Sequence, residues 1–155
     1  MNKHPTIFVD ADACPVKDEV LKVAGRHEAP VTFVANGGLR PSRDPMIRNI
    51  IVSAGFDAAD DWIAENAGET DIVITADILL ARRCVETGAG VLSPTGRLFD
   101  DTSIGMATAM RNLNQDLREA GEIKGRNAPF SQRDRSRFLE MLDRLVRQKM
   151  RERQP

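Results

Sequence analysis

The amino-acid sequence predicts a three-layer α/β/α fold built on a mostly parallel central sheet. Strand-like and helix-like segments alternate along the chain, and the strand-like segments are continuous apolar runs. Continuous apolar strands are typical of parallel sheets that helices cover on both faces. The chain has 155 residues, of which 41% are hydrophobic, and this is enough to bury one core. We therefore expect a single domain over residues 1–155.

Strands are expected where β-prone apolar residues cluster between turn signals. They cover residues 6–10, 31–35, 71–77, 90–93 and 98–99. The second of these runs ends in Asn36-Gly37-Gly38, a strong loop signal, and the loop continues to Pro45.

Helices are expected where apolar residues recur at helical spacing. They cover about 15–27, 46–54, 58–68, 78–87, 101–120 and 133–151. Pro15 suits the start of the first helix, and Gly55 follows the second. Residues 121–132 are predicted to form a mobile loop before the last helix. That helix is basic, with an apolar stripe formed by Phe138, Leu139, Leu142, Leu145 and Val146.

Several protein classes do not fit the sequence. No apolar run approaches the roughly 20 residues that a membrane span needs, and only three apolar residues separate the polar start from Asp10, too few for a signal peptide. We therefore expect a cytoplasmic protein with no membrane partner. Cys14 and Cys84 lack the Cys-x-x-Cys spacing of a zinc knuckle or a redox pair.

Charge is distributed unevenly along the chain. Residues 1–120 carry 12 basic and 18 acidic side chains, whereas residues 121–155 carry 10 and 5. A basic tail beside an acidic body indicates either a nucleic-acid-binding surface or a well-solvated helix, and both interpretations stay open. The arginines that would form such a surface are Arg133, Arg137, Arg144, Arg147 and Arg151.

Two predicted strands end in acidic residues. Asp10 and Asp12 follow the first strand, and Asp77 ends the strand that begins near Asp71. Ligands gather at the carboxyl ends of parallel strands, so these acids should converge if the two strands are neighbours. Asp71 lies at the opposite end of its strand and is excluded first. Clustered carboxylates without histidine favour Mg²⁺ or Mn²⁺ over Zn²⁺.

The chain resembles the bacterial YaiI/YqxD family, which is usually grouped with PIN-like nuclease domains. The resemblance is carried by Ile7 to Lys17, Asp71 to Asp77 and Asp134 to Phe138. In addition, Ala59-Asp60-Asp61-Trp62-Ile63 and Ile74-Thr75-Ala76-Asp77 look like segments of the flap-endonuclease branch of that fold. The resemblance implies a PIN-like fold, with Asp10, Asp61 and Asp77 as metal ligands and catalytic residues, and with Asp12 and Asp60 as supporting acids.

Basic residues near the same edge are candidates for phosphate binding. Gly37 and Gly38 allow a close approach of the backbone to a phosphate. The candidate side chains are Lys17, Arg40, Arg43 and Arg82. An ordinary Gly-Pro loop is the alternative, and neither Gly-x-Gly-x-x-Gly nor a Walker pattern is present.

These features favour a Mg²⁺- or Mn²⁺-dependent phosphodiesterase that acts on RNA or DNA, with Asp10, Asp12, Asp61 and Asp77 as the catalytic acids. Oligomeric state, the type of nucleic acid and the cleavage specificity are left open.

Two alternatives remain. Ile7-Phe8-Val9-Asp10-Ala11-Asp12 also resembles the signature of haloacid-dehalogenase-like phosphatases, in which Asp10 would be the nucleophile and Asp12 the general acid. Cys14 departs from that pattern, which has Thr or Val at this position, and no lysine lies between Thr75 and Asp101. The other alternative is a non-catalytic module that binds nucleic acid through its basic tail.

Overall fold

Six strands form one sheet in the computed structural model, which describes residues 5–12, 14–53, 58–105 and 130–153. The strands are β1 (Ile7–Asp10), β2 (Val31–Ala35), β3 (Ile47–Ile51), β4 (Ile72–Ile74), β5 (Gly90–Leu92) and β6 (Leu98–Phe99). Their order is β3-β2-β1-β4-β5-β6. All neighbouring pairs are parallel except β5 and β6, which pair antiparallel.

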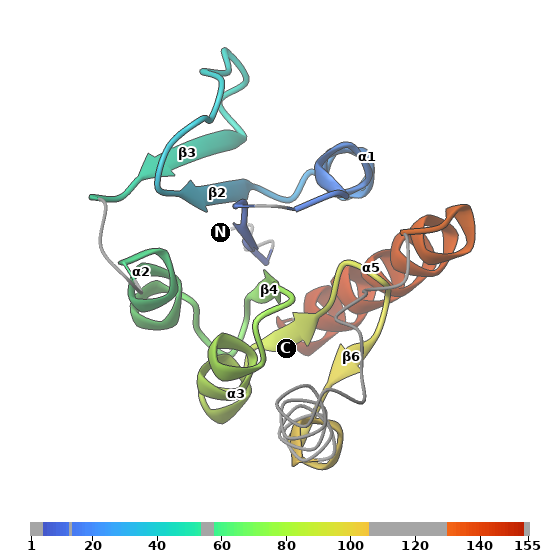
Figure 1. The fold of residues 1–155 in the computed structure, drawn as a ribbon. Coiled ribbons are helices and arrows are strands. Elements are labelled where there is room, and N and C mark those ends of the chain that lie inside the picture. The colour runs from blue at the N-terminus through green and yellow to red at the C-terminus, as the bar shows by residue number, and fades with distance from the viewer. Residues whose placement is uncertain (1–4, 13, 54–57, 106–129, 154–155) are drawn as a thin grey trace, which may run out of the picture.

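Helices cover both faces of this sheet (Figure 1). They are α1 (Lys17–His27), α2 (Ala58–Asn66), α3 (Ile78–Glu86) and α5 (Gln132–Arg153), and residues 101–105 are also helical. Figure 1 shows α1 and α5 on one side of the sheet and α2 and α3 on the other. The predicted fold class, a three-layer arrangement with a mostly parallel sheet, is confirmed.

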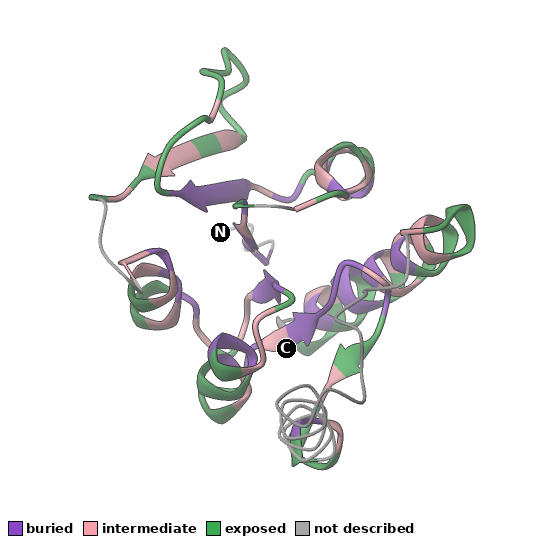
Figure 2. Ribbon diagram, in the orientation of Figure 1, coloured by how far each residue is buried: buried purple, intermediate pink, exposed green. Residues whose placement is uncertain are grey.

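Two apolar cores lie on the two faces, because successive side chains of a strand point in opposite directions. In β1, Ile7 and Val9 pack in the core beneath α1 and α5, whereas Phe8 packs in the core beneath α2 and α3. The central strands are therefore buried on both sides, as Figure 2 shows. This explains why their sequences are continuous apolar runs.

The order of the strands reverses at the boundary between β1 and β4. From β1 the chain builds outward through β2 to β3, and it then returns to place β4 on the other side of β1. Open α/β sheets bind their ligands at the carboxyl ends of the strands that flank such a reversal. Asp10 is the last residue of β1, so the fold positions it at this edge of the sheet.

The prediction of a helix over 46–54 is wrong, because residues 47–51 form β3 at the sheet edge. The sequence Ile-Arg-Asn-Ile-Ile has the i, i+3, i+4 spacing of an apolar helix face. However, its β-branched isoleucines also suit a strand, and parallel pairing with all five residues of β2 decides the outcome.

The strand predicted over 71–77 is shorter than expected, because β4 covers only Ile72–Ile74 and Asp77 is the N-cap of α3. The other boundaries that can be compared differ from expectation by at most two residues. The first helix begins at Lys17, two residues after Pro15, and α5 exceeds the predicted 133–151 by one residue at its start and two at its end. Helix boundaries commonly differ by this amount. Residues 106–120 of the predicted long helix and 121–129 of the predicted loop lie outside the described residues.

Helix α5 is held against the body by polar contacts at both ends and in its middle. Near its start, Arg135 donates to the carbonyl of Pro15 and to Glu19. In the middle, Asp143 accepts hydrogen bonds from Arg26 and His27 of α1. Near its end, the buried Lys149 ammonium donates to the carbonyl oxygens of two loops.

Within the described residues, no helix has the length and apolar character that crossing a membrane requires.

The Asp143 contacts predict a pH-dependent contribution to stability. Burial acts to raise the pKa of Asp143, but hydrogen bonds from His27 and Arg26 outweigh it, and the pKa lies below the ordinary 3.8. A carboxyl whose folded pKa is lowered stabilises the protein above its unfolded pKa, and this stability is lost as the pH falls through the folded pKa. We expect Asp143→Asn to lower the free energy of unfolding at pH 7 by about 1 kcal/mol, because Arg26 and Arg147 are half exposed.

Urea denaturation of wild type and Asp143→Asn between pH 3 and pH 7 measures this effect. The difference should be largest at neutral pH and should shrink below about pH 4. Glu140→Gln on the same helix is the control, since Glu140 pairs only with the exposed Arg144 in the described structure. An equal loss of unfolding free energy in both variants would contradict the stabilising role assigned to the Asp143 contacts.

Candidate active site at the ends of β1 and β4

Asp10 and Thr75 meet at the carboxyl ends of the two central strands. The register pairs Val9 with Ile74, so the next residues along each strand are neighbours. The Thr75 hydroxyl donates to Asp10 Oδ2 over 2.9 Å, and the same hydroxyl oxygen accepts the backbone N–H of Asp77 over 3.0 Å. Thr75 is buried, so this connection between the two strands is shielded from water.

Asp77 caps helix α3. Its Oδ1 accepts the backbone N–H groups of Leu79 and Leu80 at 2.8 and 3.3 Å. This is the usual role of aspartate at a helix N-cap, because the first backbone N–H groups of a helix have no partner within it. The cap fixes the Asp77 carboxylate beside Thr75.

Asp12 lies just beyond the end of β1 and reaches toward β2. Its Oδ2 accepts the backbone N–H of Asn36 over 3.2 Å, and the N–H of Ala11 donates to the carbonyl of Val34 over 2.9 Å. The loop that begins at Asn36 is therefore attached to the sheet edge that carries Asp10, Asp12 and Asp77, which we call the acidic edge. The Asp12 side chain is exposed.

The Asp10 carboxylate is repelled by the negative charges of Asp12 and Asp77. Burial is the main cause that raises the pKa of Asp10 above the ordinary 3.8. The hydrogen bond from Thr75 opposes this shift, whereas the negative charges of Asp12 and Asp77 add to it. The Asp10 carboxylate is thus a partly buried anion close to two others, an arrangement that a cation would stabilise.

The other predicted acids occupy a different position. Asp61 Oδ1 accepts a hydrogen bond from Arg83 Nη1 at 2.7 Å, which joins α2 to α3. The charge of Asp60 acts on Arg83 and Cys84, which also belong to α3. Neither acid is among the groups that shift the pKa of Asp10. The expected metal-ligating roles of Asp60 and Asp61 stay predictions.

Within the ranges that the structure covers, no three His, Cys, Asp or Glu side chains form a ready-made metal-binding group. The donor chemistry at this edge nevertheless suits a hard divalent cation, since the side-chain donors are carboxylate and hydroxyl oxygens. Ligation would require the carboxylates to turn toward one another, and the exposed Asp12 side chain has the room to do so.

Two of the four predicted phosphate-binding residues lie together. Lys17 and Arg40 line one hollow between α1 and the loop after β2. In contrast, Arg82 lies in another hollow, close to Glu86 and Asp101. Arg43 is exposed on the same loop as Arg40.

Cys14 sits between the acidic edge and Lys17. Burial raises the pKa of its thiol, and the nearby charges of Lys17 and Asp10 act on it in opposite directions. A raised pKa leaves little thiolate at neutral pH, so this residue is poorly suited to act as a nucleophile.

Sequence reasoning underestimated Thr75 and missed Arg135. The signal for Thr75 was available, because it follows a buried strand at the position that meets Asp10 once β1 and β4 are paired. Arg135 instead reaches the start of α1 across 120 residues of sequence, donating to the Pro15 carbonyl. No local pattern indicates such a contact.

Comparisons with known proteins agree on one family. Residues 8–148 match the model of a family described as uncharacterized BCR, YaiI/YqxD family. The chain is 71% identical to a UPF0178 protein of Agrobacterium fabrum over 147 residues, which are 95% of this chain and 96% of that protein. It is 64% identical to a UPF0178 protein of Mesorhizobium japonicum over 151 residues, or 97% of each chain. No solved structure matches the chain. The chain therefore belongs to the YaiI/YqxD family.

Proposed function

We propose that the protein is a divalent-metal-dependent phosphodiesterase of PIN-like fold that cleaves nucleic acid. One observation carries this proposal: Asp10 ends β1 where the strand order reverses and accepts a hydrogen bond from Thr75, and the charges of Asp12 and Asp77 act to raise its pKa. A protein keeps such repulsion mainly at functional sites, where perturbed pKa values cluster. A cation held between the carboxylates relieves the repulsion.

The cation that suits these oxygen donors is Mg²⁺ or Mn²⁺. When bound, such an ion supplies a nucleophile at neutral pH and neutralises negative charge on a phosphate. Asp10 and Asp77 are the proposed ligands. Asp61 joins them once its ion pair with Arg83 is broken.

Each neighbouring residue has a proposed task. Thr75 holds the Asp10 carboxylate in one orientation through the 2.9 Å hydrogen bond. Asp12, which is exposed, accepts a proton from the attacking water and orients it. Lys17 and Arg40 bind the phosphate that carries the bond to be cleaved.

A nucleic-acid substrate is proposed because the last helix adds positive charge. The side chains of Arg133, Arg137 and Arg151 are exposed on α5. By contrast, Arg144 and Arg147 pair with acids of the same helix. A row of exposed arginines attracts a phosphate backbone in a salt-dependent way.

A phosphatase with a covalent intermediate is the second candidate, and the Thr75–Asp10 contact favours it. In that reaction an Asp10 oxygen attacks phosphorus, while the departing alkoxide takes a proton from Asp12. Water then hydrolyses the phosphoaspartate, which regenerates the Asp10 carboxylate and releases inorganic phosphate. Thr75 would donate to a phosphate oxygen.

We expect Asp10→Asn to abolish both metal binding and cleavage. Removing a residue that only supports a metal ligand costs about 10–100-fold in affinity or activity, so loss of a ligand should cost at least ~100-fold. Titration calorimetry with Mg²⁺ and Mn²⁺ measures binding, and a pool of single- and double-stranded RNA and DNA reports cleavage. The matched control is Glu65→Gln on α2, whose exposed side chain lies outside the acidic cluster. Metal binding that survives in Asp10→Asn would refute the assignment of Asp10 as a ligand.

Without metal, Asp10→Asn should raise the melting temperature at pH 7. A carboxyl whose folded pKa is raised loses stability when it ionises, so its ionised form weakens the fold above that pKa. Asparagine removes the charge and still accepts the Thr75 hydrogen bond. Thermal denaturation in a chelator tests this, and a lower melting temperature than wild type would argue against repulsion among the three acids.

Thr75→Val tests the task proposed for Thr75, and trapping a covalent intermediate separates the two candidate reactions. For the phosphodiesterase we expect Thr75→Val to lose about 10–100-fold in activity with the metal still bound. The substitution disturbs the orientation of Asp10 and the position of the Asp77 backbone but removes neither carboxylate. For the phosphatase, incubation with a phosphate ester followed by hydroxylamine should modify Asp10 in wild type, and mass spectrometry detects the product. Modification of Asp10 by hydroxylamine would show a covalent intermediate, and the phosphatase would then replace the phosphodiesterase as the proposed function. Nucleic-acid binding without either reaction would indicate a non-catalytic module.

A further inference from the structure

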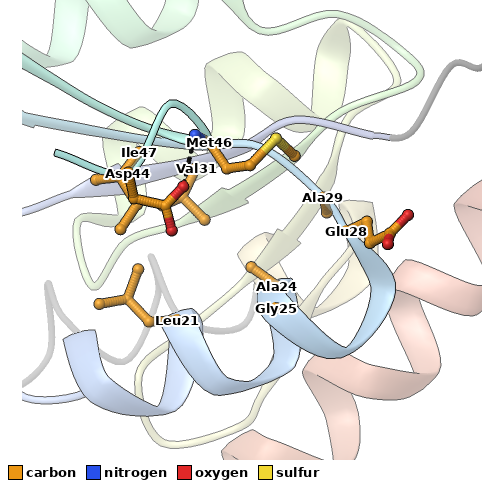
Figure 3. Close-up of a pocket in the computed structure, with 9 residues that line it drawn as sticks. All are labelled: Leu21, Ala24, Gly25, Glu28, Ala29, Val31, Asp44, Met46 and Ile47. Atoms are coloured by element: carbon orange, nitrogen blue, oxygen red, sulfur yellow. Dashed lines mark hydrogen bonds between the residues drawn. The ribbon is translucent and has the colours of Figure 1, made fainter. Parts of the chain in front are cut away.

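A groove runs along α1, between that helix and the chain segment from Gly38 to Ile47. It consists of two hollows of about 380 and 550 Å³ that share Leu21 and Ile47 in their walls. Figure 3 shows the larger hollow, with Leu21, Ala24 and Gly25 on the helix side and Ile47 on the strand side. We call the two hollows together the α1 groove.

The two halves of the α1 groove differ in charge. The smaller half is lined by Lys17 and Arg40, with Asp18 as its one acidic residue. The larger half has two acidic lining residues, Glu28 and Asp44, and no basic one. In Figure 3 the Asp44 carboxylate lies on the strand side above Leu21, whereas the Glu28 carboxylate points away from the hollow.

The middle of the groove is apolar. Leu21 and Ile47 line both halves, and Phe33 and Leu39 extend this surface in the basic half. A ligand that spans the groove therefore needs an anionic group at one end, an apolar body, and hydrogen-bond donors at the other end. A nucleotide with an amino group on its base supplies an anionic phosphate at one end, a base ring with apolar faces, and a hydrogen-bond donor at the far edge of that ring.

Hydrogen bonds fix the loop that forms the outer wall. Asn49 Nδ2 donates to the carbonyl of Arg40 over 2.7 Å, which joins the loop to β3. The backbone N–H of Asp44 donates to Ser42 Oγ, and that of Met46 donates to Asp44 Oδ1. The residues that carry the charges are thus held by the fold, so the groove is formed before any ligand arrives.

We infer that the α1 groove binds one nucleotide of a nucleic-acid strand, with its phosphate between Lys17 and Arg40 and the amino group of its base at Asp44. This inference rests on the proposed function, and it specifies the preferred substrate of that site as a nucleotide whose base carries an amino group. The connection is physical, since the loop that supplies Arg40 begins at Asn36, whose N–H donates to Asp12.

The acidic half explains why the base, and not the phosphate, should occupy it. A phosphate in this half would lie near Asp44, and like charges at close range repel. The lining of this half supplies no cation to compensate for that repulsion. We therefore place the phosphate in the half that Lys17 and Arg40 line.

Titration calorimetry of AMP into the full chain tests the groove without relying on cleavage. We perform it in a chelator, so that metal binding does not contribute. Adenosine and ribose 5-phosphate should each bind at least ~10-fold more weakly than AMP, because each lacks one of the recognised ends. UMP lacks an amino group and should also bind more weakly than AMP.

Variants locate the binding. Lys17→Gln and Arg40→Gln should each weaken the affinity for AMP by about tenfold or more. Lys22 is an exposed lysine of α1 that does not line the groove, so Lys22→Gln should leave this affinity unchanged. Gly25→Trp should fill the larger half, since a Cβ at Gly25 has no heavy atom within 4 Å. Gly25→Ala is its size control. Asp44→Asn should remove the preference for AMP over UMP.

The outcomes separate this inference from the proposed function. The groove assignment is overturned if AMP does not bind, or if wild type, Arg40→Gln and Gly25→Trp all bind AMP with the same affinity. Cleavage of nucleic acid would not rescue the assignment in either case. AMP binding that follows the expected variant pattern supports it even if no cleavage occurs. Circular dichroism verifies that Gly25→Trp is folded, and the exposed Arg40→Gln keeps the test decisive if it is not.

Discussion

The structure depends on the parallel pairing of β1 with β2 on one side and β4 on the other. This pairing buries β1 on both faces and aligns the carboxyl ends of the central strands. Because the strand order reverses at this point, the helices that follow β1 and β4, α1 and α3, lie on opposite faces of the sheet. The placement of Asp10 beside Thr75 and the attachment of Asp12 to the loop after β2 both follow from this arrangement.

The acidic edge shows how a fold accommodates a destabilising group. Asp10 is partly buried near two like charges, and this raises its pKa. The fold compensates locally, since Thr75 donates to Asp10 and Asp77 is stabilised by the first N–H groups of α3. A core-filling residue at position 10 would avoid the repulsion, so the ionised Asp10 carboxylate weakens the fold when no cation is bound.

Sequence reasoning predicted those features that local patterns determine. Apolar runs located β1 and β2, and the acids that follow β1 and β4 indicated, before any pairing was known, that acidic side chains gather at one edge of the sheet. Their proposed catalytic role stays a prediction. Sequence reasoning failed where distant segments decide, because Ile47–Ile51 has a spacing compatible with a helix and becomes a strand through pairing with β2. Similarly, the preference of Asp61 for Arg83 depends on how α2 packs against α3, and its neighbours in sequence carry no signal of this.

Helix α5 links the far end of the chain to the proposed site. Arg135 donates to the carbonyl of Pro15 and pairs with Glu19, while its guanidinium lies 4.8 Å from the centre of the Phe130 ring. These contacts fix the start of α1, and Lys17 is the first residue of that helix. The docking of α5 therefore supports the position of Lys17 at the start of α1. The last helix thus contributes to the geometry of the proposed site as well as to the apolar core. Its polar contacts with α1 and with the loop at Glu69 stabilise this docked position.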